Sequence, residues 1–283
     1  MQTHTVSGGG GCRLHVEEDG KRDGPGLLFI HAFSQCRLAW DRQVRSALAD
    51  EFRLVTVDLR GHGLSDRPRD AYGDSQVWAD DVHAVIEALA LDRPILCGWS
   101  YGGVVVCDYL RRYGEDRIGG INLVSAISKL GTEQAFDVIQ PAFLALAPGL
   151  FSTDADRSVE ALTAMIRMVP HQSPEPHDFY TMLGYNVSVP PHVREALFSR
   201  TVDNDDLLRT LRTPVLITHG EEDALVRVAA AEAHAAAIPR ASLSLYPGVG
   251  HAPFWEDAAR FNRELREFVV SSHGAAGSDR QTS

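Results

Sequence analysis

Residues 94–107 have the sequence PILCGWSYGGVVVC, and this stretch decides the fold. Its apolar start predicts a buried β-strand, its glycines predict a sharp turn, and the valines that follow predict a helix. Ser100 stands at the centre of the turn, in a G-x-S-x-G pattern. Between a strand and a helix, this pattern pushes a serine hydroxyl out of the turn at the N-terminus of the helix. Ser100 is therefore a candidate nucleophile, and a plain Gly-Ser turn is the alternative for the motif taken alone.

Short apolar runs alternate along the chain with stretches of helical apolar spacing. Strands are predicted at residues 13–17, 27–31, 53–58, 94–98, 120–125, 214–220 and 242–246. Several of these runs are apolar throughout, which is typical of strands that are buried on both faces of a parallel sheet. The sequence thus predicts the α/β class, with a mostly parallel central sheet and helices on both faces.

Residues 128–207 differ from the rest of the chain because they have helical apolar spacing, many prolines and no clear strand. They are predicted to form an inserted helical cap, with residues 1–127 and 208–271 as the core. Residues 272–283 are small and polar, have too few apolar side chains to pack, and are predicted to be a disordered tail.

A serine nucleophile needs an adjacent base, and that base needs a carboxylate to orient it. The predicted strand at residues 214–220 ends in a loop that contains Asp223, and one strand later His251 lies in a glycine-rich loop. Both loops are expected at the same edge of the sheet. The sequence therefore predicts a triad of Ser100, Asp223 and His251.

The acid loop has two other interpretations. Glu221 and Glu222 are rival acids, although exposed loop charges are the simpler explanation for them. His219, beside these acids, suggests a metal site, but no second histidine follows at a ligand-like spacing. No metal is expected.

Acyl transfer also needs two backbone N–H groups that stabilise the oxyanion. The amide of Tyr101, directly after the nucleophile, is one candidate, and the amide of Phe33, in the loop after an early strand, is the other. An apolar turn is the alternative for the Phe33 loop.

The predicted walls of the substrate pocket are Phe33, Trp99 and Trp255, and such walls suit a substrate group that is apolar and of modest size. Cap residues either line this pocket or fix the cap to the core: Phe143, Phe151, Met165, Met168, Phe179, Tyr180, Met182 and Tyr185.

The formal net charge of −11, with no dense Lys/Arg cluster, argues against nucleic acid as a partner. Apolar runs fall short of the roughly 18–20 residues of a membrane span. The N-terminal residues have no secretory pattern and the four cysteines have no paired spacing, so a cytoplasmic protein with reduced thiols is expected. A small-molecule substrate and no cofactor are expected, and the oligomeric state stays open.

The motifs follow the order found in one superfamily: HAFSQ at residues 31–35, DLRGHGLSD at 58–66, the turn at Ser100, and the segments around Asp223 and His251. The chain resembles the α/β-hydrolase superfamily, and within it the capped serine esterases, lactonases and perhydrolases. The resemblance implies the α/β-hydrolase fold, a cap that roofs the pocket, and a structural role for His62. The family's usual His-Gly is His31-Ala32 here, and alanine would be strained if that glycine has a positive φ. A serine at the turn argues against dehalogenases and epoxide hydrolases, which have aspartate there.

The leading hypothesis is hydrolysis of a carboxylic ester or lactone through an acyl-enzyme. Perhydrolysis, acyl transfer and hydrolytic C–C cleavage use the same triad and remain alternatives. A proline-type aminopeptidase would need an amine-binding acid, for which the cap offers Glu175 and Glu195. A non-enzymatic ligand receptor is a further alternative.

Overall fold

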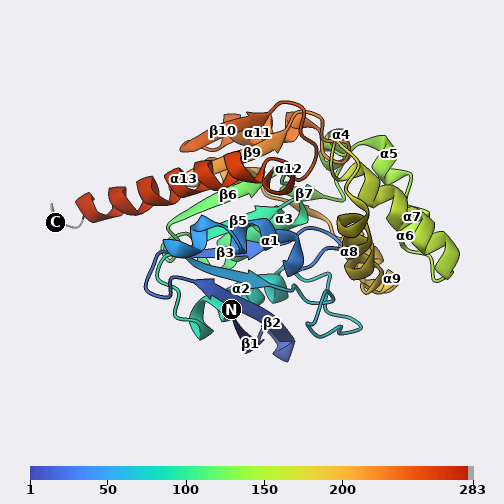
Figure 1. Ribbon diagram of the computed structural model, residues 1–283, viewed down its shortest axis with the longest axis horizontal. Coiled ribbons are helices and arrows are strands. Elements are labelled where there is room, and N and C mark those ends of the chain that lie inside the picture. Colours follow the sequence, from blue (N-terminus) through green and yellow to red (C-terminus); the bar gives the residue numbers. More distant parts are fainter. Residues whose placement is uncertain (280–283) are drawn as a thin grey trace.

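The structure is a computed structural model that describes residues 1–279, the side chains of residues 275–279 excepted. An eight-stranded sheet in the order β1-β2-β4-β3-β5-β6-β9-β10 forms the middle layer (Figure 1). Its strands are β1 (Gln2–Ser7), β2 (Arg13–Gly20), β3 (Gly26–Ile30), β4 (Arg53–Val57), β5 (Ile95–Trp99), β6 (Gly120–Val124), β9 (Val215–Gly220) and β10 (Ala241–Tyr246). β1 and β2 are antiparallel to their neighbours and the remaining pairs are parallel, which confirms the predicted class. Only β1 in this sheet was not predicted, because its residues are mostly polar and exposed.

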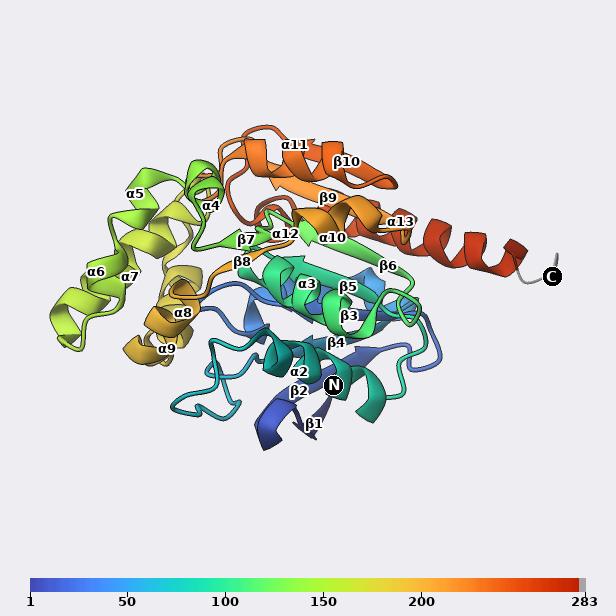
Figure 2. The same ribbon diagram turned by 180° about the vertical axis from the view of Figure 1, so that it is seen from behind.

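Helices cover both faces of the sheet. The face seen in Figure 2 carries α2 (Ser75–Ala88), α3 (Tyr101–Tyr113), α10 (Asp205–Thr210) and α11 (Val228–Ala237). The other face carries α1 (Asp41–Val44), α12 (Pro253–Glu256) and α13 (Ala258–Asp279), with short 3-10 turns at η2 (Arg37–Trp40) and η3 (Ala47–Asp50). A third 3-10 turn, η1 (Gly9–Gly11), packs on α2. Within residues 1–279, no helix combines the length and the hydropathy that a membrane span requires.

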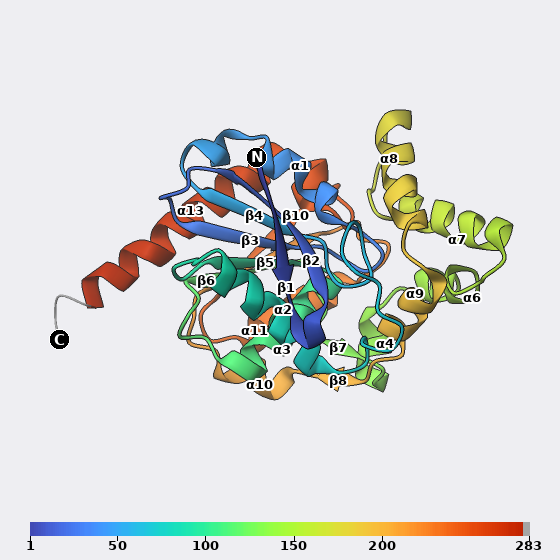
Figure 3. The same cartoon turned by 90° about the horizontal axis from the view of Figure 1, so that it is seen from below.

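The helical insertion lies at one end of the sheet, beyond the carboxyl ends of the parallel strands (Figure 3). It contains α4 (Glu133–Val138), α5 (Pro141–Leu144), α6 (Ala147–Leu150), α7 (Ala155–Met168), α8 (Pro176–Val187) and α9 (Pro191–Phe198), and is called the cap below. Two short strands that were not predicted, β7 (Lys129–Leu130) and β8 (Val202–Asp203), pair where the cap leaves and rejoins the core. This antiparallel pairing brings the two ends of the insertion together.

The predicted disorder from residue 272 differs from the structure, because α13 continues to Asp279. Ser272 is buried, and the His273 ring lies so close to Gly119 that a Cβ there would be 3.2 Å from its Cε1 atom. Residues 272–273 of the helix therefore pack against the core, His273 on the loop before β6, a contact that composition alone does not reveal. Residues 280–283 of the predicted tail lie outside the described residues.

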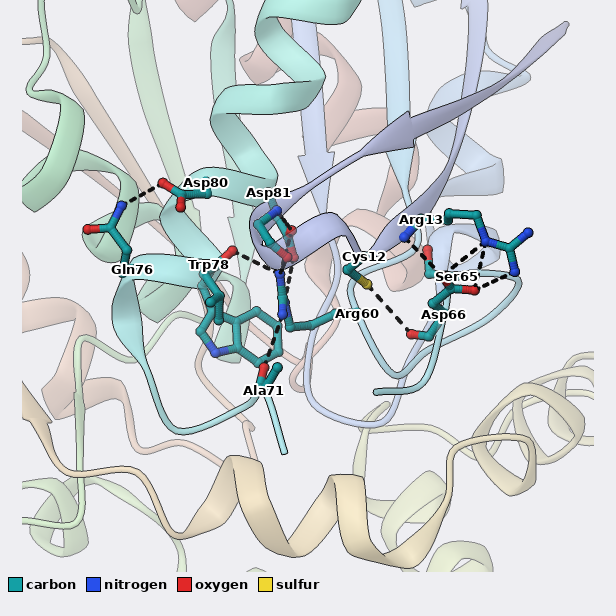
Figure 4. Close-up of polar contacts among 12 residues, drawn as sticks. Cys12, Arg13, Arg60, Ser65, Asp66, Ala71, Gln76, Trp78, Asp80 and Asp81 are labelled. Atoms are coloured by element: carbon teal, nitrogen blue, oxygen red, sulfur yellow. Dashed lines mark hydrogen bonds and ion pairs between the residues drawn. The ribbon is translucent and has the colours of Figure 1, made fainter. Parts of the chain in front are cut away.

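The turn after β4 is a structural junction, as the resemblance implied. Arg60 is buried, and its guanidinium forms an ion pair of 2.7 Å with Asp81 on α2 (Figure 4). It also donates to the carbonyl oxygen of Gly9. His62 is also buried, and its Nδ1 atom lies 2.9 Å from the Arg60 carbonyl oxygen. Burial lowers the pKa of His62 to about 3, so the ring is neutral. These contacts join β4, α2 and the N-terminal glycine turn.

Strands β3 and β5 are neighbours in the sheet, but the chain leaves them on opposite faces. It passes from β3 to α1 on one face, and from β5 to α3 on the other. Such a switch point opens a crevice at the carboxyl ends of the strands, where ligands bind in open α/β sheets. Phe33 follows β3 and Ser100 follows β5, so both lie at this crevice.

Candidate active site

Ser100 occupies the sharp turn between β5 and α3, with φ 53° and ψ −114°. A non-glycine residue rarely adopts this backbone conformation, and the surrounding packing must hold it there. A Cβ on Gly98 would lie 2.8 Å from the Gly102 carbonyl oxygen, and one on Gly102 would lie 2.5 Å from that of Ile30. Only glycine therefore permits the approach of the strand, the helix and the neighbouring β3, as the motif predicted.

Asp223 lies in the loop after β9 and is buried. Its Oδ1 atom accepts hydrogen bonds from the amides of Leu225 and Val226, at 2.8 and 2.9 Å. Its Oδ2 atom lies 2.7 Å from Nδ1 of His251 and 3.2 Å from Nε2 of His219. Burial opposes ionisation of this carboxyl, but the charge of His251 and the hydrogen bonds from both histidines outweigh burial and lower its pKa. The acid is therefore an ionised, fully hydrogen-bonded carboxylate.

The backbone of His251 is fixed on both sides. Its N–H donates to the carbonyl oxygen of Val169 in the cap, at 2.7 Å, and its carbonyl oxygen accepts from Nε1 of Trp99, at 2.9 Å. Trp99 was predicted as a pocket wall, and it does line the cavity at Ser100. Its indole N–H adds a second role that the sequence did not suggest, because it holds the loop of His251.

The amides predicted for the oxyanion are those of Phe33 and Tyr101. Neither of them donates to another backbone carbonyl in the loops and turns of residues 1–279. The neighbouring His31 is buried between the Ala32 carbonyl oxygen, 2.8 Å from Nδ1, and the Leu59 amide, which donates to Nε2 at 3.0 Å. Burial lowers the pKa of His31 to about 4, so the ring stays neutral and fixes the start of the Phe33 loop.

The expected strain at Ala32 is absent. Its φ is not positive, and Ser34 is the residue in this loop that takes the left-handed conformation, with φ 60°. Alanine therefore replaces the family's usual glycine here without a backbone penalty.

Ser100 and His251 line one apolar cavity of about 40 Å³. The core contributes Phe33, Trp99, Leu225 and Val226 to its walls, and the cap roofs it with Phe143, Met165, Val169, Leu197 and Phe198. Phe33, Phe143 and Phe198 form a cluster, with ring centroids 5.4–6.4 Å apart. Phe198 was missed by the sequence analysis because one aromatic residue in a helical insertion looks like any other packing residue.

Trp255 does not line the cavity at Ser100 but an adjoining one, which shares Trp99 and Val169 with it, so the predicted contact of Trp255 with substrate stays a prediction. Its ring packs under the Arg42 guanidinium, at 4.1 Å, and borders a smaller neighbouring cavity.

The rival acids Glu221 and Glu222 are exposed, as are the cap acids Glu175 and Glu195. Within residues 1–279, no group of three or more His, Cys, Asp or Glu residues is placed to hold a metal ion.

Arg200, just after α9, is a site-forming residue that the sequence analysis missed. Its guanidinium donates to the Tyr101 hydroxyl at 2.9 Å and forms a buried ion pair of 2.7 Å with Asp108 on α3. The cap is thereby attached to the helix that follows Ser100. A signal for this contact was present, because Asp108 interrupts an apolar run and a buried acid requires a partner.

Residues 25–258 match the family described as alpha/beta hydrolase fold, and the chain belongs to this family. Its structure is similar to that of an esterase from Rhodococcus sp. ECU1013, with 37% identity and a TM-score of 0.90 over 96% of this chain and 99% of that one. Its sequence is 30% identical to a non-heme chloroperoxidase from Streptomyces lividans, over 94% of this chain and 99% of that protein. A bifunctional esterase/perhydrolase from Acinetobacter calcoaceticus is 29% identical, over 92% of this chain and 97% of its own length. These likenesses support hydrolase activity.

The lowered pKa of Asp223 predicts a pH dependence of stability. A carboxyl that ionises more readily in the folded state stabilises the fold above its unfolded pKa, and this contribution is lost as the pH falls. From about pH 5 to about pH 3, the free energy of unfolding should fall more steeply for the parent than for Asp223→Asn. Urea denaturation at several pH values measures the difference. Glu222→Gln, which removes an exposed carboxylate next to Asp223, should follow the parent; parallel curves for the parent and Asp223→Asn would contradict the account.

Proposed function

We propose that this chain is a serine hydrolase that cleaves carboxylic esters or lactones through an acyl-enzyme intermediate. The observation that carries the proposal is the 2.7 Å hydrogen bond between His251 Nδ1 and Asp223 Oδ2, with His251 and Ser100 lining the same cavity. An aspartate on Nδ1 holds the imidazole in the tautomer that leaves Nε2 free to accept a proton. This is the arrangement that a serine nucleophile requires.

In the proposed reaction, Nε2 of His251 takes the Ser100 hydroxyl proton while Oγ attacks the substrate carbonyl carbon. The ionised Asp223 stabilises the imidazolium that forms. The amides of Phe33 and Tyr101 donate to the oxyanion of the tetrahedral intermediate, and Tyr101 also lies at the N-terminus of α3, where negative charge is favoured. Collapse breaks the ester C–O bond, and His251 returns its proton to the leaving alkoxide.

Deacylation repeats these steps with water. His251 takes a proton from the water molecule, whose oxygen attacks the acyl carbon, and the Ser100–acyl bond then breaks. The acid leaves and His251 reprotonates Ser100 Oγ. With a lactone, the alcohol and the acid are parts of one product molecule. No cofactor takes part in any of these steps.

The cavity favours a small apolar group on the substrate. Its walls are mainly aliphatic and aromatic side chains, and its volume of about 40 Å³ leaves little room beside Ser100. Burying a CH₂ group against such walls contributes about 0.8 kcal/mol. Esters with a short acyl or alkyl group are therefore the substrates that we favour, and the cap residues Phe143 and Phe198 are the side chains that would limit chain length.

Replacing the nucleophile tests the proposed function. The Ser100→Ala variant should hydrolyse p-nitrophenyl acetate about 10³-fold more slowly than the parent, because the acyl-enzyme can no longer form. Initial rates from p-nitrophenolate absorbance measure the effect, and circular dichroism checks the fold. Ser199→Ala, which removes a serine hydroxyl at the end of α9 that bonds locally to the Glu195 carbonyl oxygen, serves as the matched control. Full turnover by Ser100→Ala would refute the assignment.

Perhydrolysis is a second candidate, favoured by the likeness to the bifunctional esterase/perhydrolase and to the non-heme chloroperoxidase. Hydrogen peroxide would attack the acyl carbon in place of water, giving a peracid and free Ser100. The two nucleophiles compete for one acyl-enzyme, so the partition between them decides the activity.

Product analysis separates the two reactions. With an acetate ester and hydrogen peroxide, a perhydrolase should form peracetic acid in proportion to peroxide. The peracid oxidises added bromide to hypobromous acid, which is detected by its bromination of monochlorodimedone. Formation should disappear in Ser100→Ala. If the parent yields only acetate at every peroxide concentration, the chain is a hydrolase without this second activity.

A further inference from the structure

The loop of His251 lies against the cap segment formed by residues 169–171. The His251 amide donates to the Val169 carbonyl oxygen at 2.7 Å. A Cβ on Gly250 would lie 2.5 Å from the His171 nitrogen and 2.8 Å from the Val169 carbonyl oxygen. Two backbones from distant parts of the sequence are therefore in direct contact beside the histidine, at a position where only glycine fits.

One carboxylate bridges these two backbones. Glu256, at the end of α12, accepts at Oε1 from the Gly250 amide at 2.9 Å and from the Ala252 amide at 3.4 Å. Its Oε2 atom accepts from the His171 amide at 2.7 Å. The same side chain thus holds both residues that flank His251 and the cap segment opposite them.

Glu256 does not line the cavity at Ser100, so it has no direct contact with a substrate there. Burial raises the pKa of its carboxyl, although the hydrogen bonds from Gly250, His171 and Ala252 lower it. No arginine or lysine forms an ion pair with it within residues 1–279, so these amides are its main stabilising partners. The function of the Glu256 carboxylate is therefore to restrain the backbone of the residues whose amides it accepts from.

We infer that Glu256 is a positioning residue for the proposed hydrolase, fixing the His251 loop against cap residues 169–171 so that the imidazole keeps its alignment with Asp223. The inference rests on the proposed function. The carbonyl oxygen and the N–H of His251 are bound by Trp99 and Val169. Glu256 binds the amides of the residues on either side, so the backbone around the histidine is held throughout. Displacement of cap residues 169–171 would then also displace the base, which couples cap docking to catalysis.

The Glu256→Gln variant tests this role. Glutamine has the same shape, but its NH₂ group must face either the His171 amide or the Gly250 and Ala252 amides, and two donors repel each other. Because small displacements of a catalytic group are costly, kcat for p-nitrophenyl acetate should fall about tenfold or more, while KM changes less than about threefold. Glu267→Gln, the same change at an exposed position of α13, is the matched control and should keep the parent's values.

A spectroscopic readout separates positioning from a loss of stability. The His251 Nδ1 proton, held in a short charge-assisted hydrogen bond, should give a low-field proton resonance that Asp223→Asn removes. In folded Glu256→Gln this resonance should shift or broaden, whereas in Glu267→Gln it should stay unchanged. If Glu256→Gln does not fold, Glu256→Asp, which keeps the charge on a shorter side chain, should give the same pattern.

An unchanged resonance in a folded Glu256 variant would overturn the inference, whatever its kcat, as would a kcat within about twofold of the parent. The proposed function fails separately, if the parent itself hydrolyses no ester. In that case the resonance still reports whether Glu256 positions His251, so the two failures are distinguishable.

Discussion

The close packing of β5, α3 and β3 is the constraint on which the rest of the site depends. It forces Ser100 into a left-handed conformation, which costs on the order of 1–3 kcal/mol for a residue other than glycine. Gly98 and Gly102 make the packing possible, because a side chain at either position would collide with backbone. This packing holds the serine at the crevice between β3 and β5, and the partners that we propose for Ser100, Asp223 and His251, lie in loops at the same edge of the sheet.

Those partners are fixed by buried polar contacts that join the core to the cap. Asp223 is saturated with hydrogen bonds, and the backbone of His251 is bound by Val169 and Trp99. Arg200 adds a buried ion pair between the end of the cap and α3. Buried polar groups are costly unless they are paired, so each contact favours one placement of the cap. We propose that the cap therefore helps to build the site as well as to roof it.

Local patterns predicted much of this arrangement, and long-range contacts account for the rest. The strand–glycine–serine–helix pattern indicated the turn at Ser100, and the order of Asp223 and His251 along the chain placed them at one edge of the sheet, where the structure joins them. The sequence could not show that Trp255 borders the adjoining cavity, because its position depends on a contact with Arg42, more than two hundred residues away. The packing of residues 272–273 of α13 was missed for the same reason, since the partner of His273 precedes β6. Glu256 gave no signal, because its hydrogen bonds are to backbone amides.

The most direct test of the central claim is the reaction of the folded protein with a fluorophosphonate probe, followed by peptide mapping with mass spectrometry. The account predicts a single adduct on Ser100, which is lost when the protein is denatured before labelling, because only the folded site activates this hydroxyl. An adduct on another residue, equal labelling of denatured protein, or no adduct on the folded parent would contradict it.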